Sequence, residues 1–423
     1  MVLGATIDAY TDAMMSIFGK KKDPWDTRVY FDYAAATPMR PEVLSAMEPY
    51  WATYFGNPGG LHKEGAIAKA ALEEARTTCA KMVSARDDEL IFTGSGTESN
   101  NLAIMGAISA LIDGGTMPNE LHVITSAIEH PSILECFKTL EKRGVVVTYL
   151  PCSAEGVVSL EAIEEALQDN TVLVSVMYAN NEVGTIEPIA EIGKIVRRHK
   201  KQNKFGDAYP YFHTDASQSP LYIDMNVDAL AVDMLTLDGQ KMYGPKGVGL
   251  LYMRRGVRLR PVIIGGGQES GLRPGTENVP LIVGFAEAFS RAAESRKAET
   301  QRLVELRDYC IERIVKAVPN VQLNGPQGVS AHLRMANNVN ISIPGIDGEF
   351  MVVALSERGF ACGTRSACLR EGGPSYVLLA MGKPEIAENS LRLSFGLHTT
   401  KGHIDRFIPE LVAIVENFDK TDK

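Results

Sequence analysis

Short apolar runs alternate with amphipathic stretches through the middle of the chain. Runs such as 171–180 (TVLVSVMYAN) are mostly apolar and rich in β-branched residues, which is typical of strands buried on both faces. The predicted strands are 89–94, 122–127, 145–150, 171–180, 209–215, 231–238 and 248–253. The segments between them include the predicted helices 97–112, 131–143, 160–169 and 188–203. This βαβα alternation predicts an α/β fold whose mostly parallel sheet carries helices on both faces.

The chain has 423 residues, more than one compact core usually holds, so two domains are expected. A long helical stretch at 281–317 is interpreted as the connection between them. We therefore expect a large domain at 29–285 and a smaller α+β C-terminal domain at 286–423, with a strand near 337–345 and helices near 347–359 and 374–383. Residues 1–28 form an N-terminal extension. Its apolar residues have helical spacing and predict a short amphipathic helix: Ile7, Tyr10, Met14 and Ile17.

Composition and charge narrow the possible functions. Hydrophobic residues make up 45% and charged residues 22%, which is ordinary for a globular protein. The net charge of −9 argues against direct nucleic-acid binding, because phosphate backbones need a basic surface. No apolar run is long enough to span a membrane, and no signal or transit pattern is expected at the N-terminus. The six cysteines form no C-x-x-C metal motif, which suits a reducing, cytoplasmic location and predicts no metal.

Polar residues follow the predicted strands at the ends where parallel sheets bind ligands. After 89–94 comes SGTESNN, in which Gly96 and Thr97 open a helix. This is either an anion cradle at a helix N-terminus or an ordinary N-cap, and the two interpretations are about equal. Later strands are followed by His130 and Asn181. Each of these also has a structural explanation, as a satisfied histidine and as a turn residue.

The next two strands are followed by Asp215, Gln218 and Lys241. The same edge of the predicted sheet would then carry an acid, an amide, an imidazole, a lysine and an anion-binding helix start. Pyridoxal 5'-phosphate requires such a set, because it needs a lysine, an acid facing its ring nitrogen and an anion site. The glycine-rich run 264–271 (IGGGQESG) lacks the spacing of a dinucleotide fingerprint, which argues against NAD.

Nine blocks of the sequence resemble the pyridoxal-phosphate-dependent cysteine desulfurases of the class V aminotransferase family. They occur in family order from about Val29 to the C-terminus: YFDYAAATP, FTGSGTESNNLAI, EHPSIL, NNEVGTIEPI, HTDASQS, DGQKMYGPKGVG, GGGQESGLRPGTEN, RSAC and LRLSFG. The resemblance implies a fold type I transferase with a mostly parallel seven-stranded sheet and a smaller α+β domain.

The resemblance also implies roles around the cofactor ring. Lys241 is the Schiff-base lysine, and Asp215 pairs with the pyridinium nitrogen. Gln218 contacts the ring hydroxyl. His130 stacks on the ring and moves protons. Asn181 lies near the ring and the substrate carboxylate.

Other implied roles concern the phosphate and the substrate. Gly96 and Thr97 cradle the phosphate, and Arg392 holds the substrate carboxylate, a bidentate task suited to a guanidinium. Thr276 reaches the phosphate of the neighbouring subunit, which implies a homodimer. Two positions that normally face the phosphate depart from the family pattern, with Asp238 and Gln240 in place of a hydroxyl residue and a histidine.

The family nucleophile corresponds to Cys368, in the glycine-containing loop 361–375. Cys362 is expected to be a packed core residue instead. The implied reaction converts L-cysteine to L-alanine and leaves the sulfur on Cys368 as a persulfide. The acceptor would be a protein such as an iron–sulfur scaffold or a tRNA-thiolation relay. Two alternatives remain, a selenocysteine lyase or other fold type I lyase, and a catalytically weak homologue that binds partners.

Overall fold

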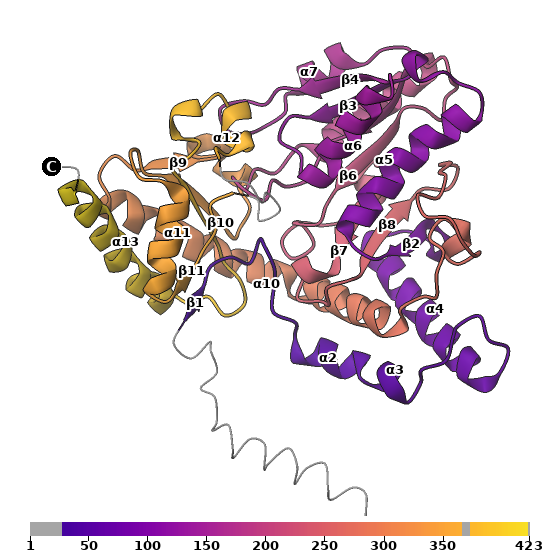
Figure 1. The fold of residues 1–423 in the computed structure, drawn as a ribbon, viewed down its shortest axis with the longest axis horizontal. Helices are drawn as coiled ribbons and strands as arrows, with labels where there is room; N and C mark the ends of the chain where they lie inside the picture. The colour runs from indigo at the N-terminus through magenta and orange to yellow at the C-terminus, as the bar shows by residue number, and fades with distance from the viewer. Residues whose placement is uncertain (1–27, 366–372, 422–423) are drawn as a thin grey trace, which may run out of the picture.

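A computed structural model describes residues 28–365 and 373–421 of the chain. The predicted helix in the extension and Cys368 lie outside the described residues. Figure 1 shows two bodies, one built around a large sheet and one around a small sheet, with α10 (Val279–Ala317) running between them.

The large sheet has seven strands in the order β2-β8-β7-β6-β5-β3-β4. Their bounds are β2 (Leu90–Thr93), β3 (His122–Ser126), β4 (Val146–Leu150), β5 (Thr171–Ser175), β6 (Tyr211–Asp215), β7 (Met234–Asp238) and β8 (Gly249–Met253). Only β8 runs against the others, since it is antiparallel to both of its neighbours while the remaining pairs are parallel. The predicted mostly parallel seven-stranded sheet is confirmed.

Successive side chains of these strands enter two different cores. In β3, for example, Val123 belongs to one core and Ile124 to the other, as the two-residue period of a strand requires. One face is covered by α5 (Gly96–Asp113) and α6 (Pro131–Lys142). The other face is covered by α4 (Lys63–Val83), α7 (Leu160–Ala166), α8 (Ile189–His199), α9 (Val227–Leu230) and the first half of α10. The predicted helices on both faces are therefore present.

The small body is an antiparallel sheet covered by helices. Its strands are β9 (Gln322–Asn324), β10 (Asn338–Ser342) and β12 (Ser390–Ser394), in the order β12-β10-β9. Its core also takes in the second half of α10, α11 (Gly348–Glu357) and α13 (Lys401–Thr421). Separately, β1 (Val29–Tyr30) pairs in parallel with β11 (Phe360–Ala361). The start of the described chain therefore packs with the C-terminal part.

The helix α10 contributes to both cores. Ile282 and Ala292 lie in the core of the large sheet, whereas Leu303 and Ile314 lie in the core of the small one. A domain boundary at residue 285 would fall inside this helix, and the proposed division of the chain stays a prediction.

Some elements differ from the expected pattern. The strand predicted over 171–180 ends at Ser175. Further along, the Asn180 side chain accepts hydrogen bonds from the backbone N–H groups of Glu182 and Val183 and forms a turn. The helix predicted at 374–383 is only α12 (Tyr376–Ala380). The sequence pattern also missed α2 (Pro41–Met47), α3 (Pro49–Ala52) and α13.

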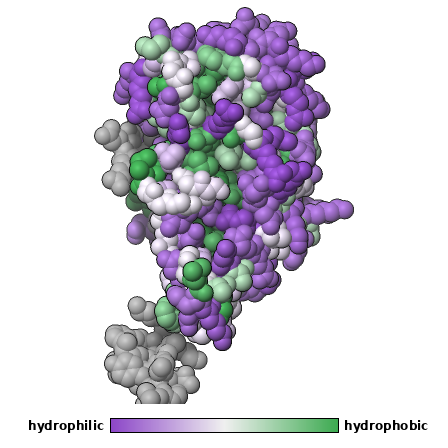
Figure 2. All heavy atoms as spheres, turned by 90° about the vertical axis from the view of Figure 1, so that its right-hand side faces the viewer, coloured by the Kyte–Doolittle hydropathy of each residue, from purple (hydrophilic) through white to green (hydrophobic). Residues whose placement is uncertain are grey.

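Two surface properties concern possible partners. Within residues 28–365 and 373–421, every helix is too short or too polar to cross a bilayer. Figure 2 shows apolar residues gathered along the middle of one face, the face on the right of Figure 1. The loop between β8 and α10 lies on this side, and its Val262, Ile263 and Ile264 are exposed.

Candidate active site

The polar residues that follow the strands surround one cavity of about 240 Å³. It lies at the carboxyl ends of the parallel strands, and Arg392 of β12 closes it from the small sheet. Ten of the predicted site residues line it: Gly96, Thr97, His130, Asn181, Asp215, Gln218, Asp238, Gln240, Lys241 and Arg392. The fold thus brings together positions that are almost 300 residues apart.

Lys241 ends a 3-10 turn, η5 (Gly239–Lys241), that follows β7 directly. Its Nζ donates hydrogen bonds to the carbonyl oxygens of Ala34 (2.8 Å) and Ala35 (2.6 Å). The Ala34 carbonyl also accepts a bond from Gln218 Nε2 (3.0 Å). The segment after β1 therefore holds the amine inside the cavity. Lys246, five positions later, is exposed.

Asp215 ends β6, and its carboxylate is held on both oxygens. The backbone N–H of Ser217 donates to Oδ1 (2.9 Å), and Asn100 Nδ2 donates to Oδ2 (2.8 Å). Asn100 comes from α5, so two elements fix the orientation of the acid. Because the residue is largely buried, a cation or N–H group in the cavity would interact with this carboxylate strongly.

His130 is the N-cap residue of α6. Its Nδ1 accepts a hydrogen bond from the Ser132 backbone N–H (3.2 Å) and contacts Ser132 Oγ (2.8 Å). In the neutral ring this leaves the proton on Nε2. Asn100 Nδ2 also donates to Ser132 Oγ (2.9 Å), so one amide connects the histidine to Asp215. We call Asp215, Asn100, Ser132 and His130 the ring end of the cavity.

Two buried ionisable groups lie behind the ring end. Burial lowers the pKa of His213 to about 4, and the charge of Asp215 opposes this effect only in part. Burial raises the pKa of Glu129 to about 8, although hydrogen bonds from Ser126 and the Met177 N–H act in the opposite direction. Both shifts favour the neutral form of the side chain.

Arg392 and Asn181 form a second polar wall. Arg392 Nη2 pairs with Asp32 Oδ1 (2.7 Å), and Nη1 donates to the Asn181 carbonyl (2.9 Å). Among the described residues, the buried Arg392 Nε and Asn181 Oδ1 have no hydrogen-bond partner. Buried polar atoms are rarely left unpaired, so these two indicate that a ligand completes the wall. A carboxylate fits Arg392 best.

The start of α5 lines another part of the cavity, where the family resemblance predicts the cofactor phosphate. We call Gly96, Thr97, Ser217, Asp238 and Gln240 the phosphate end. A Cβ atom at Gly96 would lie only 3.2 Å from both Asp238 Oδ2 and Ser217 Oγ, so glycine keeps this cradle open. The N-cap is Ser95, whose Oγ accepts the Glu98 N–H. The two interpretations of SGTESNN are compatible, because a cap and a cradle occupy the same turn.

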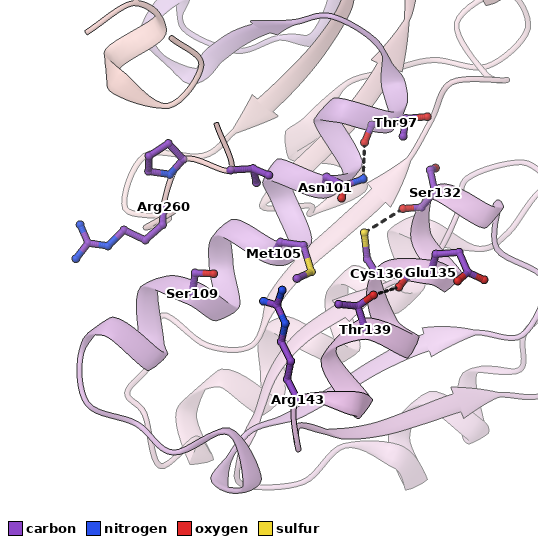
Figure 3. A pocket seen from close by; sticks show the side chains of 12 residues that line it. Thr97, Asn101, Met105, Ser109, Ser132, Glu135, Cys136, Thr139, Arg143 and Arg260 are labelled. Carbon is purple, nitrogen blue, oxygen red and sulfur yellow. Dashed lines mark hydrogen bonds between the residues drawn. The ribbon is translucent and has the colours of Figure 1, made fainter. Parts of the chain in front are cut away.

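A larger cavity of about 530 Å³ adjoins the first and shares Thr97 and Ser132 with it. Figure 3 shows side chains of α5 and α6 facing each other across this groove, with Arg143 and Arg260 towards its far end. Neither Asp215 nor Lys241 lines it. We call it the α5–α6 groove.

The remaining predicted residues do not line the cavity. Thr276 is exposed in the loop before α10. Cys368 lies outside the described residues. Cys362 is buried, and burial raises the pKa of its thiol to about 12, as expected for a packed core residue. In the described ranges, no group of three or more His, Cys, Asp or Glu side chains could hold a metal ion.

Residues 29–407 match the family model described as aminotransferase class-V. The chain belongs to this family. It is 44% identical over 390 residues to a cysteine desulfurase IscS from Dictyoglomus turgidum, covering 92% of this chain and 94% of the relative. A cysteine desulfurase IscS from Methanosarcina thermophila is 42% identical over 92% of the chain and 93% of its own length. The resemblance inferred from the nine blocks is confirmed, and with it the class of pyridoxal-phosphate-dependent enzymes.

Solved structures of similar proteins agree with this family assignment. A NifS-like protein superimposes with a TM-score of 0.83 at 34% identity, covering 92% of this chain and 100% of its own. A structure titled SspA in complex with cysteine gives a TM-score of 0.73 at 36% identity, with 87% and 98% covered. The predicted fold type I class is confirmed.

Sequence reasoning missed several residues that shape the site. Asn100 is four positions after Gly96, so helical periodicity could have placed both on one face of α5. Ser217 lies within the DASQS block beside two predicted residues. Ser132 follows His130 by two positions, a spacing typical of helix caps. No sequence signal identified the carbonyl groups of Ala34 and Ala35, because any residue supplies a carbonyl.

Proposed function

We propose that the cavity binds pyridoxal 5'-phosphate and L-cysteine, and that the chain converts L-cysteine to L-alanine while Cys368 takes the sulfur. One observation carries the proposal. A single cavity is lined by Lys241, by the doubly held Asp215 and by Arg392, whose buried Nε has no hydrogen-bond partner among the described residues.

The residues expected around the cofactor ring each have a task in this proposal. The cofactor, when bound through Lys241, supplies an electron sink. Asp215 keeps the ring nitrogen protonated, and Asn100 orients the acid. Gln218 meets the ring hydroxyl. His130 covers one face of the ring.

The phosphate end holds the anionic group of the cofactor. Gly96 and Thr97 offer the N-terminus of α5, where the helix dipole favours negative charge. Ser217 and Gln240 can donate hydrogen bonds. Thr276 from a second copy would complete the cradle.

The substrate occupies the space between Lys241 and Arg392. Arg392 binds and orients its carboxylate through Nε, which lacks a protein partner among the described residues, whereas Asn181 Oδ1 can accept a hydrogen bond from a donor of the ligand. Once its amine is neutral, Lys241 can remove the proton from the substrate Cα. Lys241 on η5 and Arg392 on β12 both line the cavity, so the two side chains can act on one substrate.

Sulfur transfer requires a thiolate. Cys368 attacks the substrate sulfur, the C–S bond breaks, and a persulfide forms on the enzyme while protonation yields alanine. An acceptor protein, such as an iron–sulfur scaffold or a tRNA-thiolation relay, would then take the terminal sulfur. This chemistry needs reduced thiols, so a reducing, cytoplasmic compartment is part of the proposal.

A homodimer is also part of the proposal. The exposed Val262, Ile263 and Ile264 flank the α5–α6 groove, which Val262 helps to line. Contiguous exposed apolar residues commonly mark interfaces. A second copy covering this face would bring its Thr276 loop near the phosphate end. Ile264→Asp should shift the protein towards monomer in analytical ultracentrifugation. Val329 provides the control. It is also exposed, but it lies in the small body, so Val329→Asp should leave the oligomeric state unchanged.

The activity is tested by incubating the purified full chain with pyridoxal phosphate and L-cysteine and measuring alanine and sulfide. Wild-type protein should form both, and Cys368→Ala should form neither at a comparable rate. Absence of alanine from the wild type would refute the desulfurase proposal and favour a partner-binding homologue. Full activity of Cys368→Ala would refute the assignment of the nucleophile. A strong preference for selenocysteine would favour a selenocysteine lyase.

A further inference from the structure

The phosphate end contains a negatively charged side chain of the protein itself. Asp238 ends β7, is largely buried and lines the cavity. Its Oδ2 accepts a hydrogen bond from the backbone N–H of Gly96 (3.2 Å), the first residue of α5. Gln240 Nε2 lies 3.4 Å from the same oxygen. The carboxylate thus uses two donors that the proposed function assigns to a phosphate.

Among the described residues, the Asp238 carboxylate contacts the backbone N–H groups of Gly96 and Gln240 and the Gln240 amide, and it forms no ion pair within 4.0 Å. Lys241, the lysine of the cavity lining, directs its amine to the carbonyl groups of Ala34 and Ala35. The partial positive charge at the start of α5 is therefore a favourable electrostatic partner of Asp238.

The other carboxylate oxygen has a separate structural task. Asp238 Oδ1 accepts the backbone N–H of Gln240 (3.1 Å) and so caps the turn that carries Lys241. Moving Oδ2 away from Gly96 need not break this cap. The residue can release the helix end while the turn stays in place.

We propose that Asp238 is a built-in occupant of the phosphate end, which any phosphorylated ligand must displace. This inference rests on the proposed cofactor. In the cofactor-free protein, Asp238 satisfies the start of α5. A bound phosphate is repelled by the negative charge of Asp238, and it must compete with Asp238 for the Gly96 N–H. Asp238 therefore weakens the binding of pyridoxal phosphate selectively, and leaves the binding of pyridoxal, which lacks the phosphate, almost unchanged.

Two substitutions separate the charge from the cap. Asp238→Ser and Asp238→Asn both remove the negative charge, and serine and asparagine both cap turns and helices well. The position of Lys241 should therefore persist in each variant. Lys246→Ala serves as a control, because it removes an exposed charge from the same loop outside the cavity.

The experiment measures, by visible absorbance, how tightly the cofactor-free full chain binds pyridoxal phosphate and how tightly it binds pyridoxal. In both Asp238 variants, Kd for pyridoxal phosphate should fall about tenfold or more, equivalent to about 1.4 kcal/mol. Kd for pyridoxal should stay within about twofold, as should both values in Lys246→Ala. Unchanged affinity for pyridoxal phosphate would overturn the inference. So would equal tightening of both ligands, which would indicate an effect on Lys241.

A second measurement does not depend on the cofactor. Inorganic phosphate should raise the melting temperature of cofactor-free Asp238→Ser more than that of the wild type, because the vacated helix end accepts the anion. An equal shift in the two proteins would contradict the inference. If neither pyridoxal form binds any variant while phosphate still discriminates between them, the proposed cofactor fails and the role of Asp238 stands.

Discussion

The ring end and the phosphate end of the cavity are built on opposite principles. At the ring end, Asp215 is held by two donors, and Asn100 joins it to Ser132 and the histidine. At the phosphate end, the Gly96 N–H of α5 and the Gln240 amide are already used by Asp238, a carboxylate that forms no ion pair within 4.0 Å among the described residues. One end is prepared for its part of the ligand, whereas the other must rearrange.

The contrast separates chemistry from affinity. Groups that act on the reacting atoms must be fixed before the ligand arrives, since preorganised charge lowers the barrier without reorganisation. Groups that only retain the ligand can change with a smaller effect on the reaction. Substitutions at the ring end should therefore reduce turnover, and substitutions at the phosphate end should mainly alter cofactor retention.

The largest expected effect distinguishes the two lysines of DGQKMYGPKG. Lys241→Ala should abolish the visible absorbance of the bound cofactor and reduce alanine formation by about 10³-fold or more, because it removes both the covalent attachment and the base. Lys246→Ala should retain both properties, because its side chain is exposed. Loss of the visible band in Lys246→Ala alone would reverse the assignment.

The next effect concerns the charge at the ring end. Asp215→Asn keeps the shape of the side chain but removes the negative charge, so the ring nitrogen loses its ionic partner. Alanine formation at saturating cofactor should fall about 100-fold, or about 2.7 kcal/mol of transition-state stabilisation. Kd for the cofactor should change much less. Normal turnover with weak cofactor binding in Asp215→Asn would show that the ring end retains the cofactor rather than promoting the reaction.

A smaller effect is expected for the residue that orients Asp215. Asn100→Ala removes one hydrogen bond to the carboxylate, and bonds to charged groups contribute about 1.5–3 kcal/mol. Turnover should fall roughly tenfold because the carboxylate loses its orientation, and the melting temperature should fall as well because a buried hydrogen bond is lost. Asn389→Ala is the control, because Asn389 Nδ2 donates to the Ile346 carbonyl and neither residue lines the cavity. Equal losses in the two variants would indicate general destabilisation.

The sequence predicted Asp215, His130 and Lys241 better than the residues that orient Asp215 and His130. Asp215, His130 and Lys241 follow predicted strands directly, and the topology of a parallel sheet brings strand ends together whatever lies between them. Asn100 and Ser132 act through side-chain contacts between α5 and α6. Strand and helix patterns contain no information about which residues of two neighbouring helices meet.

The small body shows the same limit. The strand around Asn338–Ser342 was expected, but β12, which carries Arg392, was identified only through the LRLSFG block. The pairing of β1 with β11 joins residues more than 300 positions apart, and two-residue strands leave no periodic signal. At the phosphate end, the sequence indicated that Asp238 was unusual. Only the structure shows that it accepts the Gly96 N–H.

The smallest effect on activity is expected for Glu129, whose side chain lies behind the ring end. Its pKa rises from 4.5 in an exposed chain to about 8 in the folded protein, mainly because of burial. Between these values the unfolded chain releases its proton while the folded protein keeps it. The free energy of unfolding therefore falls as pH rises, by at most about 1.4 kcal/mol per pH unit for this group, and levels off above pH 8. Glu129→Gln should make that dependence shallower between pH 5 and 8 in urea unfolding and leave turnover at pH 7 within about twofold. Glu187, with a similarly raised pKa, should maintain part of the slope. A slope in Glu129→Gln equal to that of the wild type would mean that Glu129 is ionised in the folded protein, and that the ring end contains a second negative charge beside Asp215.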